Sequence, residues 1–297
     1  MISAFDTPGH FYRGNLHGHS SLSDGRYTVE QVCELYARAG YDFCCVTDHF
    51  RDKYDFPIAD TRPYRADDFT TLIGAELHAP QTSRGVDWHI LAVGLPLDFE
   101  PPQPAETGPA LARRAAGVGA FIAIAHPDWY QLQRCDGEAL DAAHAVEIYN
   151  HTSELNTSRG GGASFYDDLL SAGHRLNCLA VDDSHWNIND AFGAWVMVKA
   201  PSNSPEALLE ALHNGRFYST QGPTIHVIHR HSETLTVETS PADHVVLVGS
   251  GLDAVVAHGP NRTVAELPLE KFNGRWCRAV VIDAAGRRAW SNPLWLD

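Results

Sequence analysis

Short apolar runs alternate with amphipathic helical stretches from residue 12 to residue 222. Several of these runs are apolar at every position, which is typical of strands buried on both faces in a parallel sheet. The strand candidates are residues 12–16, 43–47, 71–75, 90–95, 121–125, 145–149, 176–181 and 194–198. Because strands and helices alternate along this stretch, the pattern predicts an α/β fold whose units close into a barrel.

Two of the intervening helices have ends that can be read from the sequence. Thr28 has the character of an N-cap residue, with Gln31 as its capping-box partner, and Gly40 is placed to end that helix. The dipeptide Ser204-Pro205 marks a second start, because proline is favoured at the first helical position, and Gly215 marks the end.

The pattern changes after Gly222-Pro223. Short strand-like runs follow one another with turn residues between them and with no helical pattern. They are residues 225–228, 235–238, 245–248, 254–257, 264–267 and 277–282, with a last strand after the turn at 283–286. We therefore expect two domains, a barrel in residues 1–222 and a small β-sandwich-like domain in residues 223–297.

Charge and composition narrow the classes of partner. The chain carries 22 Lys and Arg against 37 Asp and Glu, a formal net charge of −15, together with 17 His. An acidic chain is a poor partner for a nucleic-acid backbone, and no apolar run has the length of about 20 residues that a membrane span needs. The first ten residues do not resemble a signal peptide, and six cysteines without C-x-x-C spacing indicate reduced thiols, so we expect a cytoplasmic protein.

Histidine and carboxylate side chains recur where the strand candidates end. His17 and His19 are two residues apart, so both rings of an extended strand point to one side, and Asp183 and His185 repeat this spacing. The remaining candidates of this kind are Asp24, His49, Glu76 and His126. Strand ends meet at the mouth of an α/β barrel, so the set favours one metal site.

Each of these residues taken singly has an ordinary structural explanation. A lone histidine is more often a hydrogen-bonded core or surface residue, and Glu76 could lie on the surface. A carboxylate at the end of the buried run 72–75 would, however, be costly to desolvate unless it were paired or bound to a metal. His89 differs from the others because it precedes its strand candidate, so the pattern does not place it at the mouth.

The order of these motifs resembles the PHP (polymerase and histidinol phosphatase) superfamily. The motifs are H-x-H at 17–19, S-D-G at 23–25, T-D-H at 47–49, G-A-E at 74–76, H-I-L-A-V-G at 89–94, A-H-P at 125–127 and D-S-H at 183–185. The similarity covers residues 12–222 and includes the stretches 147–150 and 215–223. It implies a distorted β/α barrel of about seven strands that holds two or three divalent metal ions.

The resemblance also implies which residues bind each ion. The first ion would be held by His17, His19, Glu76 and Asp183, the second by Glu76, His89 and His126, and the third by Asp24, His49 and His185. Some family members have histidine at the position of Asp24, which leaves the occupancy of the third position open. Mixed imidazole and carboxylate ligands suit Zn, Mn or Fe, and the sequence does not choose among them.

The implied activity is a metal-dependent phosphoesterase that attacks phosphorus with a metal-bridged hydroxide. Glu76, Asp183 and His185 are the expected catalytic residues. The expected substrate is a small phosphorylated metabolite or nucleotide, either a phosphomonoester or a cyclic phosphate. Two alternatives stay open, namely a metal-dependent hydrolase of a non-phosphate, amide-type bond and a non-catalytic metal-binding module.

Several other residues have both a functional and a structural interpretation. Asn150 and Arg159 are candidate substrate contacts, although Arg159 could equally be a solvated surface residue. Trp129 and Trp186 follow metal motifs and could line a pocket, with core packing as the alternative. Asp48 could orient a ligand histidine or be an ordinary loop residue. For the C-terminal domain, which has no motif of its own, we expect packing or a homo-oligomer interface.

Overall fold

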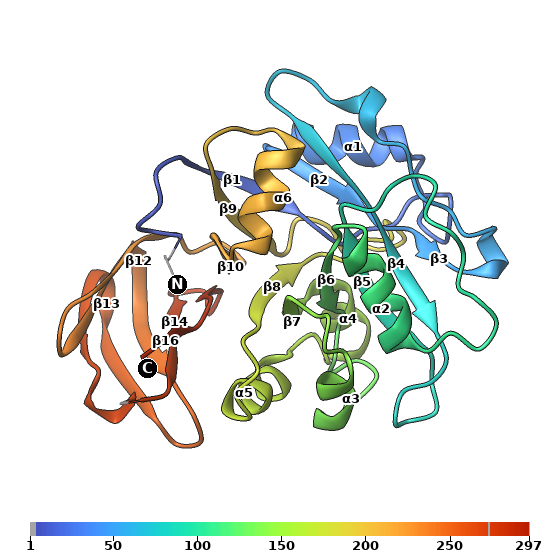
Figure 1. Cartoon of the computed structure of the whole chain (residues 1–297). Coiled ribbons are helices and arrows are strands. Elements are labelled where there is room, and N and C mark those ends of the chain that lie inside the picture. The colour runs from blue at the N-terminus through green and yellow to red at the C-terminus, as the bar shows by residue number, and fades with distance from the viewer. Residues whose placement is uncertain (1–3, 273, 297) are drawn as a thin grey trace.

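The computed structural model describes residues 4–272 and 274–296. Its strands form one continuous hydrogen-bonded network, in the order β11-β12-β14-β15-β10-β9-β1-β2-β4-β5-β6-β7-β8, with β3, β13 and β16 attached at the side. Figure 1 shows two lobes, one built from the strands up to β10 and the helices, the other from the strands that follow.

The larger lobe contains a mixed sheet with helices packed against it. Its strands are β1 (His10–Asn15), β2 (Phe43–Val46), β3 (His49–Phe50), β4 (Thr70–Ala79), β5 (Trp88–Val93), β6 (Phe121–Ile124), β7 (Ala145–Asn150), β8 (Asn177–Val181), β9 (Trp195–Ala200) and β10 (Phe217–Thr220). Each predicted strand of this region is present, with ends that differ by a few residues. The α/β class is therefore confirmed, whereas the barrel strand count of about seven stays a prediction.

Two strands of this sheet run against the others. The pairs β1–β2, β2–β4, β6–β7 and β7–β8 are parallel, whereas β5 is antiparallel to both of its neighbours and β9 is antiparallel to β1. The prediction of a parallel sheet was wrong for β5 and β9. A continuous apolar run reports burial on both faces, and it carries no information about strand direction.

The last strand of the sheet order, β8, meets β10 through a side chain. Ser219 on β10 accepts a hydrogen bond from the backbone N–H of Ala180 at 3.0 Å and donates one to the carbonyl of Cys178 at 2.9 Å. Alternate residues of the strands, such as Leu91, Phe121 and Val196, point into one buried cluster that α6 also joins. Strands and α6 thus share one apolar core.

The helices are α1 (Val29–Arg38), α2 (Gly108–Gly117), α3 (Arg134–Ala139), α4 (His151–Thr157), α5 (Ala163–Ser171) and α6 (Pro205–His213). The capping box of Thr28 and Gln31 is confirmed, because each side chain bonds to the other residue's backbone N–H. Ser204 caps α6, and Pro205 is its first residue. Among the described residues there is no helix long and apolar enough to cross a membrane.

The smaller lobe contains β11 (Ile225–Arg230), β12 (Thr234–Val248), β13 (Ala254–Pro268), β14 (Trp276–Ile282), β15 (Arg288–Ser291) and β16 (Leu294–Trp295). Four predicted short strands are in fact the two long strands β12 and β13, so the expected breaks within them were wrong. The pairing shifts register between Glu238 and His244, and such bulges let a strand bend without ending. β12 pairs with β11 along its first part and with β14 along its second.

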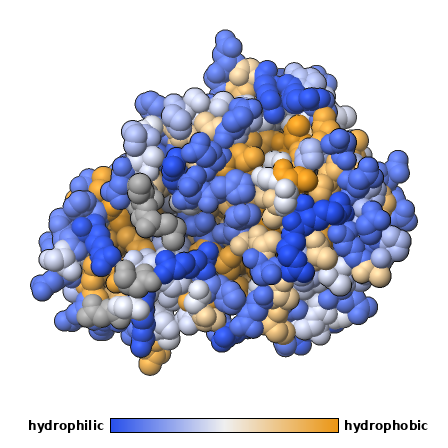
Figure 2. Space-filling view, in the orientation of Figure 1, coloured by the Kyte–Doolittle hydropathy of each residue, from blue (hydrophilic) through white to orange (hydrophobic). Residues whose placement is uncertain are grey.

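The domain boundary at residue 222 and the β-sandwich-like form of residues 223–297 stay predictions. The sheet passes without interruption from β9 through β10 and β15 to β14. The core also continues between the lobes, because Trp276, Val280 and Trp290 of β14 and β15 belong to the same buried cluster as Tyr166 of α5. Figure 2 shows a largely hydrophilic surface with hydrophobic patches on both lobes.

A buried ion pair joins the two lobes. The guanidinium of Arg278 on β14 donates from Nε and Nη2 to the two carboxylate oxygens of Asp167 on α5, each at 2.8 Å. Arg278 is only 3% exposed, so the carboxylate compensates a charge that water cannot reach.

We expect Asp167→Ala to lower the free energy of unfolding by about 3 kcal/mol, because it leaves the buried guanidinium without its carboxylate. Urea denaturation measures this change. The matched control is Asp141→Ala, which breaks an ion pair with Arg113 whose side chains are more than half exposed and should cost less than about 1 kcal/mol. Equal costs for the two variants would contradict the role given to this pair.

Candidate metal centre

The two segments with i, i+2 spacing are joined to each other by backbone hydrogen bonds. The N–H of Asp183 donates to the carbonyl of His17 at 2.9 Å, and the N–H of His19 donates to the carbonyl of Ser184 at 2.8 Å. The segment after β1 therefore lies beside the segment after β8. As a result the carboxylate Oδ1 of Asp183 lies 3.2 Å from His17 Nε2 and 2.9 Å from His19 Nε2.

Glu76 lies at the middle of the candidate ligands. Its side chain on β4 is fully buried, with Oε1 2.7 Å from His89 Nδ1 and 3.1 Å from His126 Nε2. Oε2 lies 3.7 Å from Nε2 of both His17 and His19. Burial by itself would raise the pKa of Glu76, but the surrounding imidazoles outweigh it and hold the pKa well below its ordinary value.

The reversed direction of β5 explains why His89 belongs to this group. In the antiparallel pair β4–β5, His89 lies opposite His78, which follows Glu76 by two residues. The first residues of β5 therefore lie at the same edge as the last residues of β4. The sequence pattern could not place His89 because it does not reveal that β5 is reversed.

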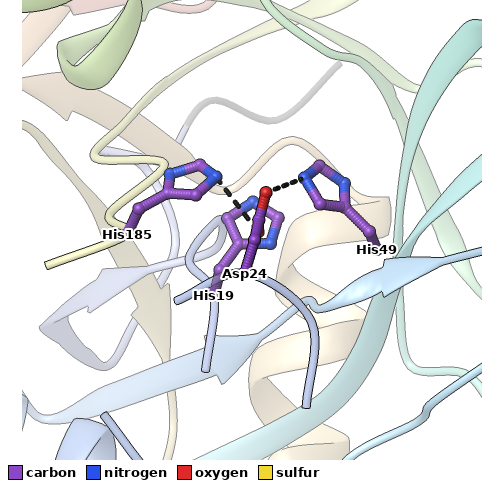
Figure 3. A group of neighbouring side chains, drawn as sticks. All are labelled: His19, Asp24, His49 and His185. Atoms are coloured by element: carbon purple, nitrogen blue, oxygen red, sulfur yellow. Dashed lines mark ion pairs between the residues drawn. The ribbon is translucent and has the colours of Figure 1, made fainter. Parts of the chain in front are cut away.

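A second group of ligand atoms gathers around Asp24 (Figure 3). The carboxylate of Asp24 lies 3.5 Å from His49 Nε2 and 3.5 Å from His185 Nε2, so it stands between the two rings. The ring of His19 lies next to both, with centroid distances of 4.3 Å to His49 and 4.2 Å to His185. His185 Nδ1 lies 2.8 Å from the backbone carbonyl of Asp183. Because a carbonyl can only accept a hydrogen bond, a neutral His185 ring carries its proton on Nδ1.

Buried aspartates hold the loops that carry these ligands. Asp48 accepts hydrogen bonds from Ser20 and Ser23 in the loop of Asp24, so it supports that loop and does not orient a histidine directly. Asp190 accepts from the backbone N–H groups of His185 and Trp186, at 2.9 and 3.0 Å.

Several buried ligand atoms have no hydrogen-bond partner among the described residues. They are His17 Nε2, His19 Nδ1, Glu76 Oε2, His78 Nδ1 and His126 Nδ1. Buried polar atoms without a hydrogen-bond partner are costly. A divalent cation would satisfy them, so the donor set fits the metals that the fold implies.

Four overlapping groups bring ligand atoms within 4.8 Å of one another. They are His19-Asp24-His49-His185, His49-Glu76-His78-His89, His17-His19-Glu76 and His17-His126-Asp183. All nine positions implied by the sequence resemblance lie in these groups. How the ions would be shared among them, and which ligand binds which ion, stay predictions.

Backbone strain marks two of the candidate ligands. His126 has φ of 24° and Asp183 has φ of 57°, values that residues with a Cβ rarely adopt. Such strain persists only where the surroundings enforce it, and it is concentrated at functional sites.

A cavity of about 530 Å³ opens onto the ligand groups. Besides candidate ligands, its walls include the aromatic rings of Tyr54 and Trp129, the cations Arg51 and Lys53, and the exposed residues Asn156, Asn187 and Ile188. Trp129 thus lines the pocket, whereas Trp186 is 9% exposed and packs against Tyr36 in the core.

The two predicted substrate contacts, Asn150 and Arg159, are not among the residues that line this cavity. Arg159 is exposed and is not among the residues that line the cavity, where Arg51 and Lys53 supply the positive charge. Asn150 is fully buried, and its amide nitrogen donates to Asp183 at 3.0 Å and to Glu147 at 2.9 Å. Its side chain is therefore engaged in holding the site together.

Sequence reasoning did not count Glu147 or His78 among the metal ligands. Glu147 is 1% exposed and lies 2.7 Å from His17 Nδ1. His78 is 6% exposed, with Nε2 2.9 Å from His49 Nδ1. The signal for Glu147 was present in the stretch 147–150, but nothing in its spacing shows that it meets His17, 130 residues away.

Comparison with known proteins agrees with this picture. No family model matches the chain. Over 167 residues the chain is 25% identical to the DNA polymerase/3'-5' exonuclease PolX of Bacillus subtilis (strain 168). The aligned region is 56% of this chain and only 28% of that protein. A two-domain protein from Bacteroides vulgatus ATCC 8482, containing a predicted PHP-like metal-dependent phosphoesterase, matches with a TM-score of 0.53 and 16% identity over 93% of both chains.

The chain shares its fold with that two-domain protein. The resemblance drawn from the motifs is confirmed at the level of the fold. An amidohydrolase from Chromobacterium violaceum, solved with bound sulfate and no metal, matches 60% of this chain and 89% of its own at 15% identity. Its TM-score is 0.46.

If the four ligand groups bind metal, the chain purified without chelators should contain at least two divalent ions per molecule. Elemental analysis by inductively coupled plasma mass spectrometry measures this ratio. A protein that stays essentially free of metal after growth with added Zn²⁺ and Mn²⁺ would contradict the site.

Metal binding should also release a proton from His49. Burial lowers the pKa of this ring, but Glu76 and Asp24 outweigh it and raise the pKa to about 10 in the metal-free protein. Because only the neutral ring binds a metal, affinity for Mn²⁺ should rise with pH between about 6.5 and 10. The stabilisation that protonated His49 gives the metal-free fold is complete below about 6.5 and is lost as pH rises through about 10.

Isothermal titration calorimetry at about pH 7.5, in two buffers of different ionisation enthalpy, counts the released protons. We expect at least one proton to be released when the protein is saturated with Mn²⁺. Binding with no buffer dependence would show that the ligands are already neutral.

Proposed function

We propose that this chain is a metal-dependent hydrolase of small phosphate esters. The observation that carries the proposal is the fully buried carboxylate of Glu76, with six imidazole rings within 4 Å of its oxygens. Its Oε1 lies near His89 and His126, and its Oε2 lies 2.5 Å from His49 Nδ1, so both oxygens face imidazole nitrogens. Such a group is suited to bridging two divalent ions.

The cavity above these ligands supports a small substrate. Its volume of about 530 Å³ falls within the range of about 300–1,000 Å³ that is usual for small-molecule sites. Trp129 and Ile188 are 38% and 46% exposed within its walls, so they can cover an apolar part of a leaving group. A phosphomonoester, a nucleotide or a cyclic phosphate fits these requirements.

Two cations in the wall of the cavity, Arg51 and Lys53, support phosphate over a neutral amide, although Arg51 also pairs with Asp87. Arg51 and Lys53 follow His49 closely in the chain and line the same cavity. Lys53 donates to the hydroxyl of Tyr54 at 3.0 Å, and no carboxylate within the described chain forms an ion pair with it. Cations in this position attract an anionic substrate and stabilise the charge that develops during phosphoryl transfer.

Bound divalent ions would polarise the phosphoryl oxygens and make a water molecule nucleophilic at neutral pH. The residues of the chain set the conditions for this chemistry. Glu76 and Asp183 supply the negative charge that attracts the cations. His185 presents Nε2 toward Asp24 and the cavity, while Nδ1 is held by the carbonyl of Asp183. We therefore keep Glu76, Asp183 and His185 as the residues on which catalysis depends.

The alternatives are an amide-type hydrolase and a non-catalytic metal-binding module. The cationic wall argues against the first, and a cavity that leads directly to the candidate ligands argues against the second, since a purely structural site needs no access for substrate. Zn, Mn and Fe all remain open as the ion. A cytoplasmic location and a homo-oligomer through the C-terminal strands stay predictions.

A panel of phosphate esters tests the proposal directly. Phosphomonoesters, nucleotides and cyclic phosphates are incubated with the Mn²⁺- or Zn²⁺-loaded protein, and free phosphate or the opened ester is measured. We expect turnover of at least one class that a chelator abolishes. Hydrolysis of amide substrates in place of every phosphate ester would instead favour the alternative.

For the substrate so identified, Glu76→Gln should reduce kcat by more than about 100-fold, because an amide cannot replace a bridging carboxylate. The control is Glu106→Gln, which changes a carboxylate paired with Arg114 away from the cavity and should leave kcat within about twofold. Full activity of Glu76→Gln would remove this residue from its role.

A further inference from the structure

Glu147 is a buried carboxylate at the metal centre that the implied ligand set does not use. It lies on β7 and is 1% exposed. Its Oε1 lies 2.7 Å from His17 Nδ1. Its Oε2 accepts the backbone N–H of His126 at 2.7 Å and the side-chain amide of Asn150 at 2.9 Å.

All three partners face the carboxylate as hydrogen-bond donors. A backbone N–H can only donate. The amide of Asn150 is fixed in orientation, because its Oδ1 accepts from the N–H of Ser153 at 2.9 Å while its Nδ2 also donates to Asp183 at 3.0 Å. An ionised carboxylate can only accept, so the proton between His17 and Glu147 is on Nδ1 of His17.

The opposite nitrogen of His17 is thereby directed at the ligand groups. His17 Nε2 is buried and has no hydrogen-bond partner in the part of the chain that the structure describes; it lies 3.2 Å from Asp183 Oδ1 and 3.7 Å from Glu76 Oε2. A histidine that donates one ring N–H to a carboxylate presents the other nitrogen to a metal in a fixed direction, and the carboxylate increases its basicity.

The second oxygen of Glu147 acts on two further candidate ligands. Its hydrogen bond to the N–H of His126 holds the residue whose φ of 24° is strained. Through Asn150 it also reaches Oδ2 of Asp183, which turns Oδ1 of that carboxylate toward His17 and His19. His17, His126 and Asp183 are the three members of one ligand group. A single carboxylate thus supports every member of that group, two directly and one through an amide.

We propose that Glu147 is a positioning residue that fixes the protonation of His17 and the orientation of His126 and Asp183, so that this group is prepared to bind a divalent ion. This inference rests on the proposed metal centre. It also assigns Asn150 as the connection between Glu147 and Asp183.

The variant Glu147→Gln tests this role, because it keeps the shape and removes one acceptor. The backbone N–H of His126 and the fixed amide of Asn150 still require an oxygen, so the new amide nitrogen must face His17 Nδ1. His17 can meet it only by losing the proton on Nδ1 and carrying one on Nε2, the atom that would bind the ion.

Two measurements follow. Histidine side-chain ¹⁵N NMR of the metal-free protein, with His17 assigned by comparison with His17→Gln, should show a proton on Nδ1 in the wild type and none there in Glu147→Gln. Calorimetric titration with Zn²⁺ should show about a 10–100-fold weaker affinity at the part of the centre that contains His17. Binding to the Asp24 group, which Glu147 does not touch, should be unchanged.

The matched control is Asp136→Asn. Asp136 is 3% exposed and accepts hydrogen bonds from Ser83 N, Ser83 Oγ and Gln133 N, but it lies outside the cavity. This variant should lower stability without changing Zn²⁺ affinity or the His17 signal.

Wild-type Zn²⁺ affinity in Glu147→Gln, or a wild-type His17 without a proton on Nδ1, would overturn the inference. The NMR measurement uses the metal-free wild type, so it decides the protonation of His17 even if Glu147→Gln does not fold. A wild type that binds no Zn²⁺ but has the expected His17 signal would instead count against the metal centre.

Discussion

The structure of the larger lobe depends on one electrostatic constraint, the burial of the Glu76 carboxylate on a central strand. An ionised carboxylate removed from water is stable only where positive charge or hydrogen-bond donors replace its hydration. Here the surrounding groups are almost all imidazoles, which can supply a proton or, when neutral, a lone pair. The pKa values of these imidazoles shift in opposite directions. The carboxylates raise the pKa of His49 to about 10, while burial and neighbouring imidazoles lower the pKa of His19 to about 3. The cluster needs positive charge, but not all of its rings can be protonated. A divalent cation would supply the missing charge.

Several independent features of the fold bring the candidate ligands together. Backbone hydrogen bonds hold the segment at His17 against the segment at Asp183. The reversed strand β5 brings His89 to the edge where β4 presents Glu76. Buried aspartates then anchor the two loops that carry Asp24 and His185. The ligand set is therefore held by the backbone and by supporting side chains, which is the arrangement expected of a preorganised centre.

Much of the fold around the candidate metal centre could be predicted from the sequence. The strands around the centre, the caps of α1 and α6, and the meeting of residues as distant as His17 and Asp183 follow from apolar runs, capping residues and repeated motif positions. Strand direction did not follow, because a run buried on both faces has the same composition in either direction. For the same reason the place of His89 was open until β5 was seen to be reversed.

The supporting residues were harder to predict than the ligands. Glu147 was visible only as part of a similar stretch, since its contact with His17 depends on how β7 lies relative to β1. Arg159 was a reasonable phosphate contact by type, but the cavity takes its charge from Arg51 and Lys53, which no motif marks. In the smaller lobe, the bulge within β12 could not be separated from a turn, because both interrupt the alternation of apolar and polar residues.

Anomalous X-ray diffraction from crystals grown with Mn²⁺ or Zn²⁺, recorded on both sides of the metal absorption edge, tests the central claim most directly. The account predicts strong anomalous peaks within bonding distance of Glu76, with His17 or His89 among the other ligands. Peaks confined to other histidines, such as the exposed pair His244 and His258 on β12 and β13, or no peaks at all, would contradict it.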